Sequence, residues 1–304
     1  MRILAVFNAK AGTLAGLSVD EVGRQVRDAF TRAGHHLEVI APDPHDFPAC
    51  VQRTIAEKFD VVLAGGGDGT INSLANLLAG SDVALGVLPL GTHNHFAREL
   101  GIPLTLEAAL QALVIGSVNT MHVAEVNGRV FLNFSGIGFH PNVVKYRDAQ
   151  REAVGRSKPW AMVISLVRNV VRLPLLRVSL TSATWNARRL TPSVIVCTNA
   201  LQMEEFGVKS VSYPRRDRLN VYVARSTSRL GFMWLMVRAL FRSLPTARKF
   251  ESIDVGQLSV STRRTHMRVS LDGEIVDLTT PLNYRVRENG LRVLVPVRNN
   301  SGSS

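Results

Sequence analysis

Three consecutive glycines followed by an aspartate stand in the segment LAGGGDGTIN, residues 63–72. Glycines let a backbone approach a bulky polar group closely, and the amide groups at the start of a helix attract phosphate. The segment is not the dinucleotide fingerprint, because Thr70 stands where a glycine is needed, and it lacks the Lys-Ser/Thr of a P-loop. It therefore indicates either a phosphate-binding turn or a tight turn that merely needs glycines. Asp68 raises a question, because a carboxylate would repel a phosphate.

Two further polar loops favour the phosphate-binding interpretation. Gly91 and Thr92 follow an apolar run in LPLGTHNHFARELGIP, and Asn8 and Gly12 follow another in FNAKAGT. Each loop comes after a predicted strand. Because the carboxyl ends of parallel strands lie at one edge of a sheet, the three loops are expected to converge on one crevice, where they could hold a nucleotide's phosphates and sugar.

The elements that position these loops alternate between strand and helix over the first 122 residues. Apolar runs at 2–8, 36–42, 59–66 and 83–91 predict buried parallel strands. Helices are predicted between them; the first begins at a capping box of Ser18 and Glu21. This pattern predicts an α/β nucleotide-binding domain with a doubly wound, mostly parallel sheet.

The pattern changes after residue 122. Asn127-Gly128 lies between alternating apolar residues and predicts a hairpin. Further alternating runs extend to LRVLVPV, with predicted helices at 160–174 and 229–245. The sequence thus predicts a second, β-rich antiparallel domain. The last residues, 299–304, are expected to be a disordered tail.

The net charge of +12 is distributed unevenly. Residues 1–122 hold 8 basic against 12 acidic side chains, whereas residues 123–304 hold 28 against 12. A strongly basic half attracts phosphate-rich partners such as nucleic acid or an anionic membrane. The small number of aromatic residues among the arginines argues against nucleic acid.

Three features of the sequence bear on where in the cell the protein is located. The first residues lack the apolar core of a signal peptide, and no apolar run is long enough to span a bilayer. The two cysteines, Cys50 and Cys197, have no metal or redox spacing. We expect a cytoplasmic protein, peripheral at the inner face of the membrane.

Five motifs, in their order along the chain, resemble the diacylglycerol kinase catalytic family, which includes bacterial lipid kinases and the sphingosine and ceramide kinases. They are GGGDGTIN, LPLGTHNHFARELGIP, SGIGFH, LDGEIVDL and GLRVLVP. The resemblance implies ATP- and Mg²⁺-dependent phosphorylation of a lipid hydroxyl in a cleft between the two domains. It also implies that residues 285–298 return to the domain formed by 1–122, leaving 123–284 as the lipid-substrate domain.

The resemblance assigns roles to individual residues. It places the nucleotide on Asn8, Gly66, Gly67, Asp68, Gly69, Thr70, Asn72, Gly91 and Thr92. It places the general base in Asp272-Gly273-Glu274, without deciding between the two carboxylates. If that stretch were extended, both carboxylates would face the same side. Asp68 is then explained: it binds the Mg²⁺ of the nucleotide, directly or through water, so that a cation bridges carboxylate and phosphate.

The sequence departs from the family at the acidic residues that build an accessory Mg²⁺ site in typical bacterial members. His95 and His122 stand where the family has Asp, and Arg215-Arg216-Asp217 replaces Asp-Asp-Gly. Imidazole and arginine are unsuitable ligands for Mg²⁺. We therefore expect no accessory metal site, with hydrogen bonds and an arginine in its place.

Several interpretations remain. The leading one is a lipid kinase acting on diacylglycerol or a ceramide- or sphingoid-type acceptor. The alternatives are a catalytically impaired lipid-binding relative, suggested by the lost acidic residues, and a kinase of a soluble acceptor of the NAD-kinase type, which shares the GGDGT-type loop. Asp68, Asp272 and Glu274 argue against the first alternative, and the basic second domain argues against the other. A homodimer is left open.

Overall fold

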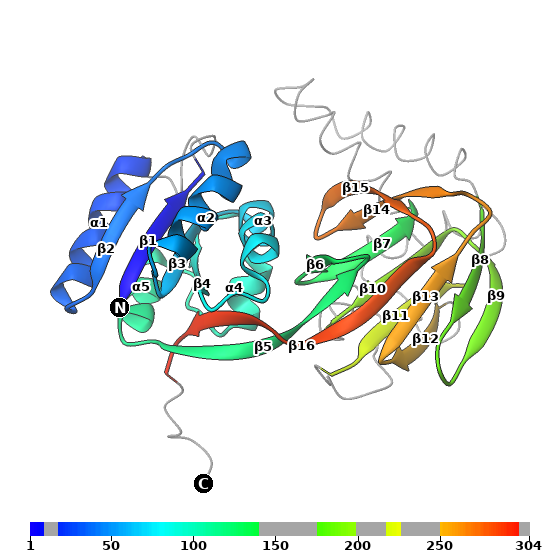
Figure 1. Cartoon of the computed structure of the whole chain (residues 1–304). Coiled ribbons are helices and arrows are strands. Elements are labelled where there is room, and N and C mark those ends of the chain that lie inside the picture. The colour runs from blue at the N-terminus through cyan, green and yellow to red at the C-terminus, as the bar shows by residue number, and fades with distance from the viewer. Residues whose placement is uncertain (9–17, 140–174, 199–216, 226–249, 298–304) are drawn as a thin grey trace, which may run out of the picture. The chain divides into compact units, whose positions relative to one another are not determined.

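The computed structural model describes residues 1–8, 18–139, 175–198, 217–225 and 250–297 (Figure 1). The chain divides into two compact units, one formed by 1–123 with 288–304 and the other by 124–287. Strands β5 (Ser117–Val126) and β16 (Leu282–Val295) contain residues of both units. The predicted fold class, an α/β domain followed by a β-rich domain, is confirmed.

The first unit is built on a parallel sheet in the strand order β2-β1-β3-β4. Val293 of β16 pairs in parallel with Leu85 of β4, which adds a fifth strand beside β4. The strands β1, β3 and β4 are fully buried except at Arg2, as apolar and small residues covered on both faces must be. Their bounds are β1 (Arg2–Phe7), β2 (His36–Ile40), β3 (Val61–Gly66) and β4 (Ala84–Pro89).

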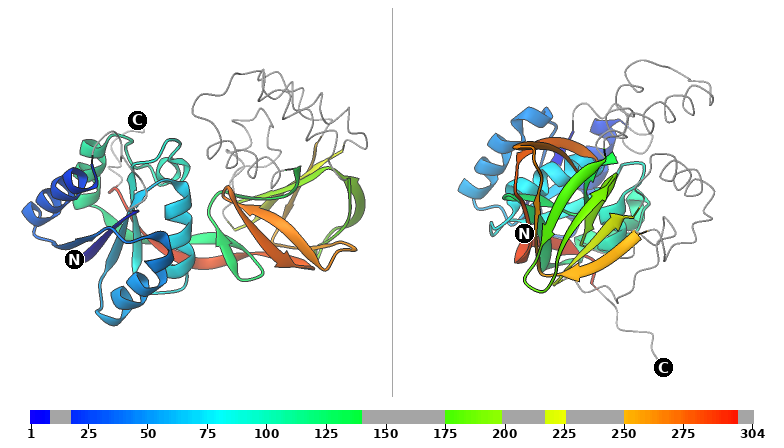
Figure 2. Two further views of the ribbon diagram at one scale, coloured as in Figure 1. Left: turned by 90° about the horizontal axis from the view of Figure 1, so that it is seen from above. Right: turned by 90° about the vertical axis from the view of Figure 1, so that its right-hand side faces the viewer.

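Helices pack on the two faces of this sheet. α1 packs against β2 and α5, and α5 packs against β4, whereas α3 packs against β3, β4 and α2 (Figure 2). The predicted N-cap is confirmed at the start of α1, where the Ser18 hydroxyl accepts from the Glu21 N–H at 3.2 Å. The helices are α1 (Val19–Arg32), η1 (Pro44–Asp46), α2 (Phe47–Ala56), α3 (Asp68–Leu78), α4 (His95–Glu99) and α5 (Leu106–Val114).

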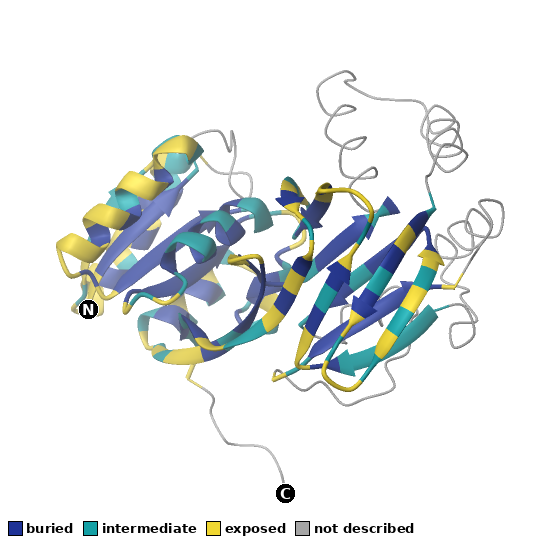
Figure 3. Cartoon of the chain, turned by 45° about the vertical axis from the view of Figure 1, so that its right-hand side comes forward, coloured by how far each residue is buried: buried dark blue, intermediate teal, exposed yellow. Residues whose placement is uncertain are grey.

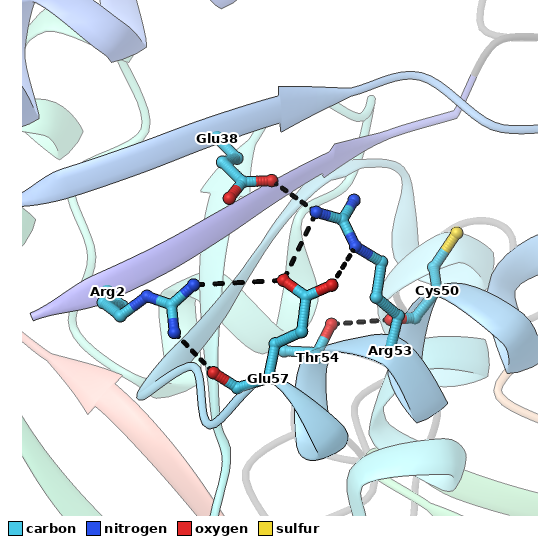
Figure 4. Close-up of polar contacts among 6 residues, drawn as sticks. All are labelled: Arg2, Glu38, Cys50, Arg53, Thr54 and Glu57. Carbon is cyan, nitrogen blue, oxygen red and sulfur yellow. Dashed lines mark hydrogen bonds and ion pairs between the residues drawn. The ribbon is translucent and has the colours of Figure 1, made fainter.

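A network of four charged side chains joins α2 to the strands β1 and β2 (Figure 4). Arg53 donates to Glu57 and to Glu38, each at 2.8 Å, and Arg2 lies 3.9 Å from Glu57. The hydrogen bond from Arg53 lowers the pKa of the Glu57 carboxyl. All four side chains are nearly half exposed, so the network orients α2 more than it stabilises the fold.

The second unit contains two antiparallel sheets. One has the order β12-β11-β10-β7-β14-β15, and the other contains the first part of β16 followed by β13, β8 and β9. The hairpin of β5 and β6 turns at Asn127 and Gly128, whose positive φ values of 47° and 83° suit the predicted Asn-Gly turn. The strands are β6 (Arg129–Phe131), β7 (Phe134–Gly138), β8 (Leu176–Thr181), β9 (Asn186–Thr191), β10 (Ser193–Cys197), β11 (Leu219–Ala224), β12 (Phe250–Val255), β13 (Gln257–Ser261), β14 (His266–Leu271) and β15 (Glu274–Thr279).

A large apolar core joins the two sheets of this unit. Val178, Val221 and Val260 belong to it, and burial alternates along β8 and β13 as expected for strands with one face in a core (Figure 3). Within the core, the Tyr284 hydroxyl pairs with the Ser135 hydroxyl at 2.9 Å. Burial raises the pKa of Tyr284, so this hydroxyl stays protonated at neutral pH.

Several sequence predictions fall outside the described residues. They are the helices at 160–174 and 229–245, Gly12, Arg215, Arg216 and the tail 299–304. Within the parts of the chain that the structure describes, no helix has the length and apolarity needed to cross a membrane.

Candidate active site

The loops after β3 and β4 touch one another. A Cβ added to Gly91 would lie 2.7 Å from the Cα of Gly67 and 3.0 Å from Asn94 Oδ1. Gly66 is equally constrained, because an added Cβ would lie 2.8 Å from the Thr70 hydroxyl. The glycines at these positions therefore allow the two loops and the first turn of α3 to pack together, as the sequence predicted for loops at one edge of a parallel sheet.

Asn94 fixes the loop after β4, a role that the sequence did not reveal. Its φ of 52° is left-handed, and its buried side chain closes the loop on itself. Asn94 Oδ1 accepts from the Gly91 N–H at 2.9 Å, while Nδ2 donates to the Pro89 and Gly91 carbonyls at 3.2 and 2.8 Å. Asn is among the residues that adopt left-handed backbone angles. This preference was the signal in the sequence that could have revealed the role of Asn94.

Asp68 links the two glycine-rich loops. It lies in the first turn of α3, where the helix dipole stabilises a carboxylate, and its Oδ1 accepts from the backbone N–H of His95 at 3.1 Å. His95 opens α4, so one aspartate also caps the neighbouring helix. The rings of His93 and His95 stack, with their centroids 5.5 Å apart.

The loop after β1 joins the same group. Asn8 Nδ2 donates to the Thr70 hydroxyl at 3.2 Å, and the Asn8 N–H donates to the Gly65 carbonyl at 3.3 Å. Asn72 is 3% exposed, beneath the first turn of α3. The predicted nucleotide residues in this unit therefore gather at three adjacent loop ends: Asn8 after β1; Gly66, Gly67, Asp68, Gly69, Thr70 and Asn72 at the junction of β3 and α3; and Gly91 and Thr92 after β4.

The position beside Gly67 is open. Gly67 is the N-cap of α3, and a Cβ placed on it would find none of the described residues within 4 Å beyond its neighbours in the chain, in contrast to Gly66 and Gly91. The first amides of a helix have no partner within the helix, so they are available to an anion beside the cap. The residues present thus suit the phosphates of a nucleotide, and Asp68 offers the oxygen ligand that an accompanying Mg²⁺ prefers.

Asp272 and Glu274 lie in the second unit, at the turn between β14 and β15. The stretch is not extended, so the condition under which both carboxylates would face one side is not met. Asp272 and Gly273 have φ values of 48° and 90° and form a two-residue turn, after which Glu274 begins β15 and is exposed. The reason is local: Asp-Gly is a preferred pair for a tight hairpin turn. Whether these carboxylates act with the loops of the first unit stays a prediction.

Neither cysteine is suited to nucleophilic catalysis. Burial raises the pKa of the Cys197 thiol, and the nearby charge of Asp272 raises it further. Burial is also the main cause of the raised pKa of Cys50. A reactive cysteine needs a lowered pKa, which neither thiol has.

A comparison with known protein families finds a match to most of the first unit. The sequence profile described as the diacylglycerol kinase catalytic domain matches residues 2–126. This part of the chain is thus similar to a diacylglycerol kinase catalytic domain. This domain contains the two touching loops, Asn8 and Asp68.

Relatives that match the chain are also named diacylglycerol kinases. A diacylglycerol kinase of Bacillus subtilis is 37% identical over 118 residues, which cover 38% of this chain and 39% of that protein. One from Mycobacterium tuberculosis is 26% identical over 245 residues, covering 75% of this chain and 73% of the relative. The first curated relatives are matched over about two fifths of their length.

A solved structure shows that the likeness in fold extends beyond the catalytic domain. The crystal structure of a diacylglycerol kinase from Bacillus anthracis superposes with a TM-score of 0.68 at 19% identity and covers 97% of each chain. At this identity the likeness shows the fold alone.

The residues that replace the family's acidic positions make other contacts. His122 Nδ1 accepts from the Asn289 N–H at 3.1 Å, and the His95 ring stacks on that of His93. Among the described residues, no group of three or more His, Cys, Asp or Glu side chains could hold a metal ion. The absence of an accessory site itself stays a prediction, because Arg215 and Arg216 lie outside the described residues.

This prediction has a direct test. A chelated, nucleotide-free sample should keep its Tm when Mg²⁺ is added, because a ligand that binds only the folded state would raise it. The Tm of a sample with Ca²⁺ added in place of Mg²⁺ serves as the control for general ionic effects. A substantial rise with Mg²⁺ alone would show that a structural metal site exists.

Proposed function

We propose that this chain is an ATP-dependent lipid kinase that transfers the γ-phosphoryl group to a hydroxyl of a membrane lipid. The observation that carries this proposal is the contact of Gly91 with Gly67, which places two loops of the catalytic domain around the open space at the start of α3. The names of the relatives, diacylglycerol kinases, suggest a lipid acceptor. Diacylglycerol and a ceramide- or sphingoid-type alcohol are the candidate acceptors.

Different residues of the catalytic domain would bind different parts of the nucleotide and its Mg²⁺. The amides at Gly67, Gly69 and Thr70 would receive phosphate oxygens, because they stand at the start of α3 beside open space. Asn8, Asn72 and Thr92 would add polar contacts to the rest of the nucleotide. Asp68 would hold Mg²⁺ directly or through water while its bond to the His95 N–H keeps it in place. When bound, Mg²⁺ and ATP supply the transferable phosphoryl group and neutralise its developing charge.

The acceptor hydroxyl needs a base, because its own pKa is far above neutral. The second unit offers Asp272 and Glu274 for this role. Their presence in the sequence favours a kinase over a catalytically impaired lipid-binding relative. The antiparallel second unit, with its excess of arginine, favours a lipid acceptor over a soluble one of the NAD-kinase type.

An acceptor panel tests this proposal. Purified chain would be incubated with labelled ATP, Mg²⁺ and one of four lipids in mixed micelles: diacylglycerol, ceramide, sphingosine or phosphatidylglycerol. NAD serves as the soluble acceptor in a parallel reaction. We expect label in one lipid class and none in NAD. Label in NAD alone would favour the soluble-acceptor kinase, and ATP binding without transfer to any acceptor would favour the impaired relative.

The basic second part of the chain supports peripheral binding to an anionic membrane at its inner face. Arg177 and Arg188 are exposed on β8 and β9, and neither strand contains a carboxylate. The helix predicted at 229–245, which we also expected to dock, lies outside the described residues.

Sedimentation with vesicles measures this binding. Each basic residue near an anionic surface contributes about 1 kcal/mol, and salt screens the attraction beyond roughly 8 Å at physiological ionic strength. Binding should therefore fall as phosphatidylglycerol is diluted with neutral lipid and as salt is raised. Equal binding to neutral vesicles at high salt would contradict an electrostatic anchor.

A further inference from the structure

One sheet of the second unit turns a face with arginines and no carboxylate away from the apolar core. Exposed residues alternate with buried core residues along β8 and β13 (Figure 3). The strands β8, β9 and β13 contain no Asp or Glu at all. We call their outward side the arginine face, which includes Arg177, Ser179, Arg188, Leu190, Ser259 and Ser261.

Two arginines are neighbours on this face. The register of β8 and β9 pairs Arg177 with Leu190 and Ser179 with Arg188, so the arginines lie on adjacent strands and diagonal to one another. The Cβ atoms of side chains placed in this way are roughly 7–8 Å apart. Both arginines are exposed.

The positive charges of Arg177 and Arg188 are not balanced within the described parts of the chain, where neither side chain forms an ion pair. Other arginines of the same strands do have partners: Arg189 Nε donates to Glu251 at 2.9 Å, and Arg285 pairs with Glu125. Two like charges at close range repel one another, so the fold gains no stability from this pair. An anionic partner would remove the repulsion.

Protection of the sheet edge explains only one of the two arginines. β9 is the last strand of its sheet, and a charged side chain on such a strand discourages pairing with another chain. This accounts for Arg188. Arg177 lies on β8, which is flanked by β9 and β13, so it has no edge to protect. Binding of an anionic partner accounts for both residues.

The other residues of the arginine face suit a flat, anionic lipid surface. Ser179, Ser259 and Ser261 have short side chains, so the longer guanidinium groups extend beyond them. Leu190 is 39% exposed beside Arg177 and offers an apolar side chain that lipid headgroups can cover. The strands β8, β9 and β13 contain no aromatic residue on which a base could stack, which argues against nucleic acid.

We propose that the arginine face docks this chain on an anionic membrane surface. The guanidinium groups of Arg177 and Arg188 bind lipid phosphates, for which their paired N–H donors are suited, and Leu190 lies among the headgroups. This docking role rests on the membrane binding in the proposed function, and it names the surface that is responsible. It attributes the binding to two neighbouring residues rather than to the net charge of +12.

Sedimentation with vesicles of phosphatidylglycerol and phosphatidylcholine tests the surface. Arg177→Gln/Arg188→Gln should lower the partition coefficient about 30-fold, because each basic residue contributes about 1 kcal/mol and about 1.4 kcal/mol is tenfold. Arg24→Gln/Arg27→Gln is the matched control, since it removes the same charge from two exposed positions of α1, and it should retain wild-type partitioning. The Tm of both double variants should stay at the wild-type value.

A single substitution separates docking from edge protection. Arg177→Gln leaves the edge strand β9 unchanged and should lower the partition coefficient about fivefold. Wild-type partitioning of Arg177→Gln/Arg188→Gln would overturn the proposal. An equal loss in both double variants would also overturn it, because net charge alone would then decide. Loss of binding to single-stranded DNA with unchanged vesicle binding would assign the face to nucleic acid instead.

A kinase assay distinguishes a failure of this proposal from a failure of the proposed function. In neutral detergent micelles without anionic lipid, Arg177→Gln/Arg188→Gln should phosphorylate the acceptor at the wild-type rate, because neither residue belongs to the candidate active site. A wild-type protein that phosphorylates lipid without binding anionic vesicles would contradict the docking surface alone. A wild-type protein that phosphorylates no lipid would contradict the proposed function, while the sedimentation comparison would still decide the docking surface.

Discussion

The Asp68→Asn variant is expected to lose phosphoryl transfer while it keeps its fold. Asparagine retains the Oδ1 that accepts from the His95 N–H at 3.1 Å, so the link between the two glycine-rich loops survives. What disappears is the negative charge that, in the proposed function, holds Mg²⁺ against the phosphates. We expect kcat/KM to fall on the order of 10²- to 10³-fold, the range for removal of one preorganised electrostatic group.

Initial rates with saturating lipid, measured over a Mg²⁺ titration, check this prediction. The Tm should stay within a degree or so of the wild-type value, because no contact of the folded chain is lost. Asp82→Asn is the control, since Asp82 is a fully exposed carboxylate of the same unit. Near-normal turnover of Asp68→Asn at every Mg²⁺ concentration would remove Asp68 from the mechanism.

The Gly67→Ala variant is expected to fold normally and to lose most of its affinity for ATP. The added methyl would meet no atom within 4 Å, and the φ of −83° is one that alanine adopts readily. The methyl would instead occupy the space at the cap of α3 where we place a phosphate. A loss of at least about tenfold in affinity, equal to 1.4 kcal/mol of binding free energy, is the minimum that we expect.

Calorimetric titration with ATP and Mg²⁺ measures this affinity. Gly256→Ala is the matched control: its added methyl also meets no atom within 4 Å, but it lies between β12 and β13 of the second unit. Gly91→Ala offers a contrast, because its methyl would lie 2.7 Å from Gly67 Cα and should disturb both loops. Wild-type affinity in Gly67→Ala would show that the phosphates bind elsewhere.

Much of the fold could be predicted from local patterns. Apolar β-branched runs indicated β1 and β3, the Ser18 capping box marked the start of α1, and Asn127-Gly128 marked a hairpin. Each of these signals depends on residues within a few positions of one another. Short-range sterics and hydrogen bonding therefore suffice to predict these elements.

The features of the site that could not be predicted depend on contacts between distant residues. Asp68 meets the backbone of His95, 27 positions later, and Asp272 meets a loop about 140 positions earlier. No residue near Asp272 in the sequence indicates the three backbone N–H groups from which its carboxylate accepts hydrogen bonds. Taken by itself, Asp-Gly-Glu indicates a surface turn, and the structure has a two-residue turn there.

The most direct test of the central claim, transfer of the γ-phosphoryl group of ATP to a lipid hydroxyl, is a comparison of two labels. Wild-type protein is incubated with Mg²⁺ and the preferred lipid in micelles, in one reaction with γ-labelled ATP and in the other with α-labelled ATP. The account predicts label in the extracted lipid from γ-labelled ATP only, at a rate that falls sharply in Asp68→Asn. Label from α-labelled ATP, or label from neither with any lipid of the panel, would contradict it.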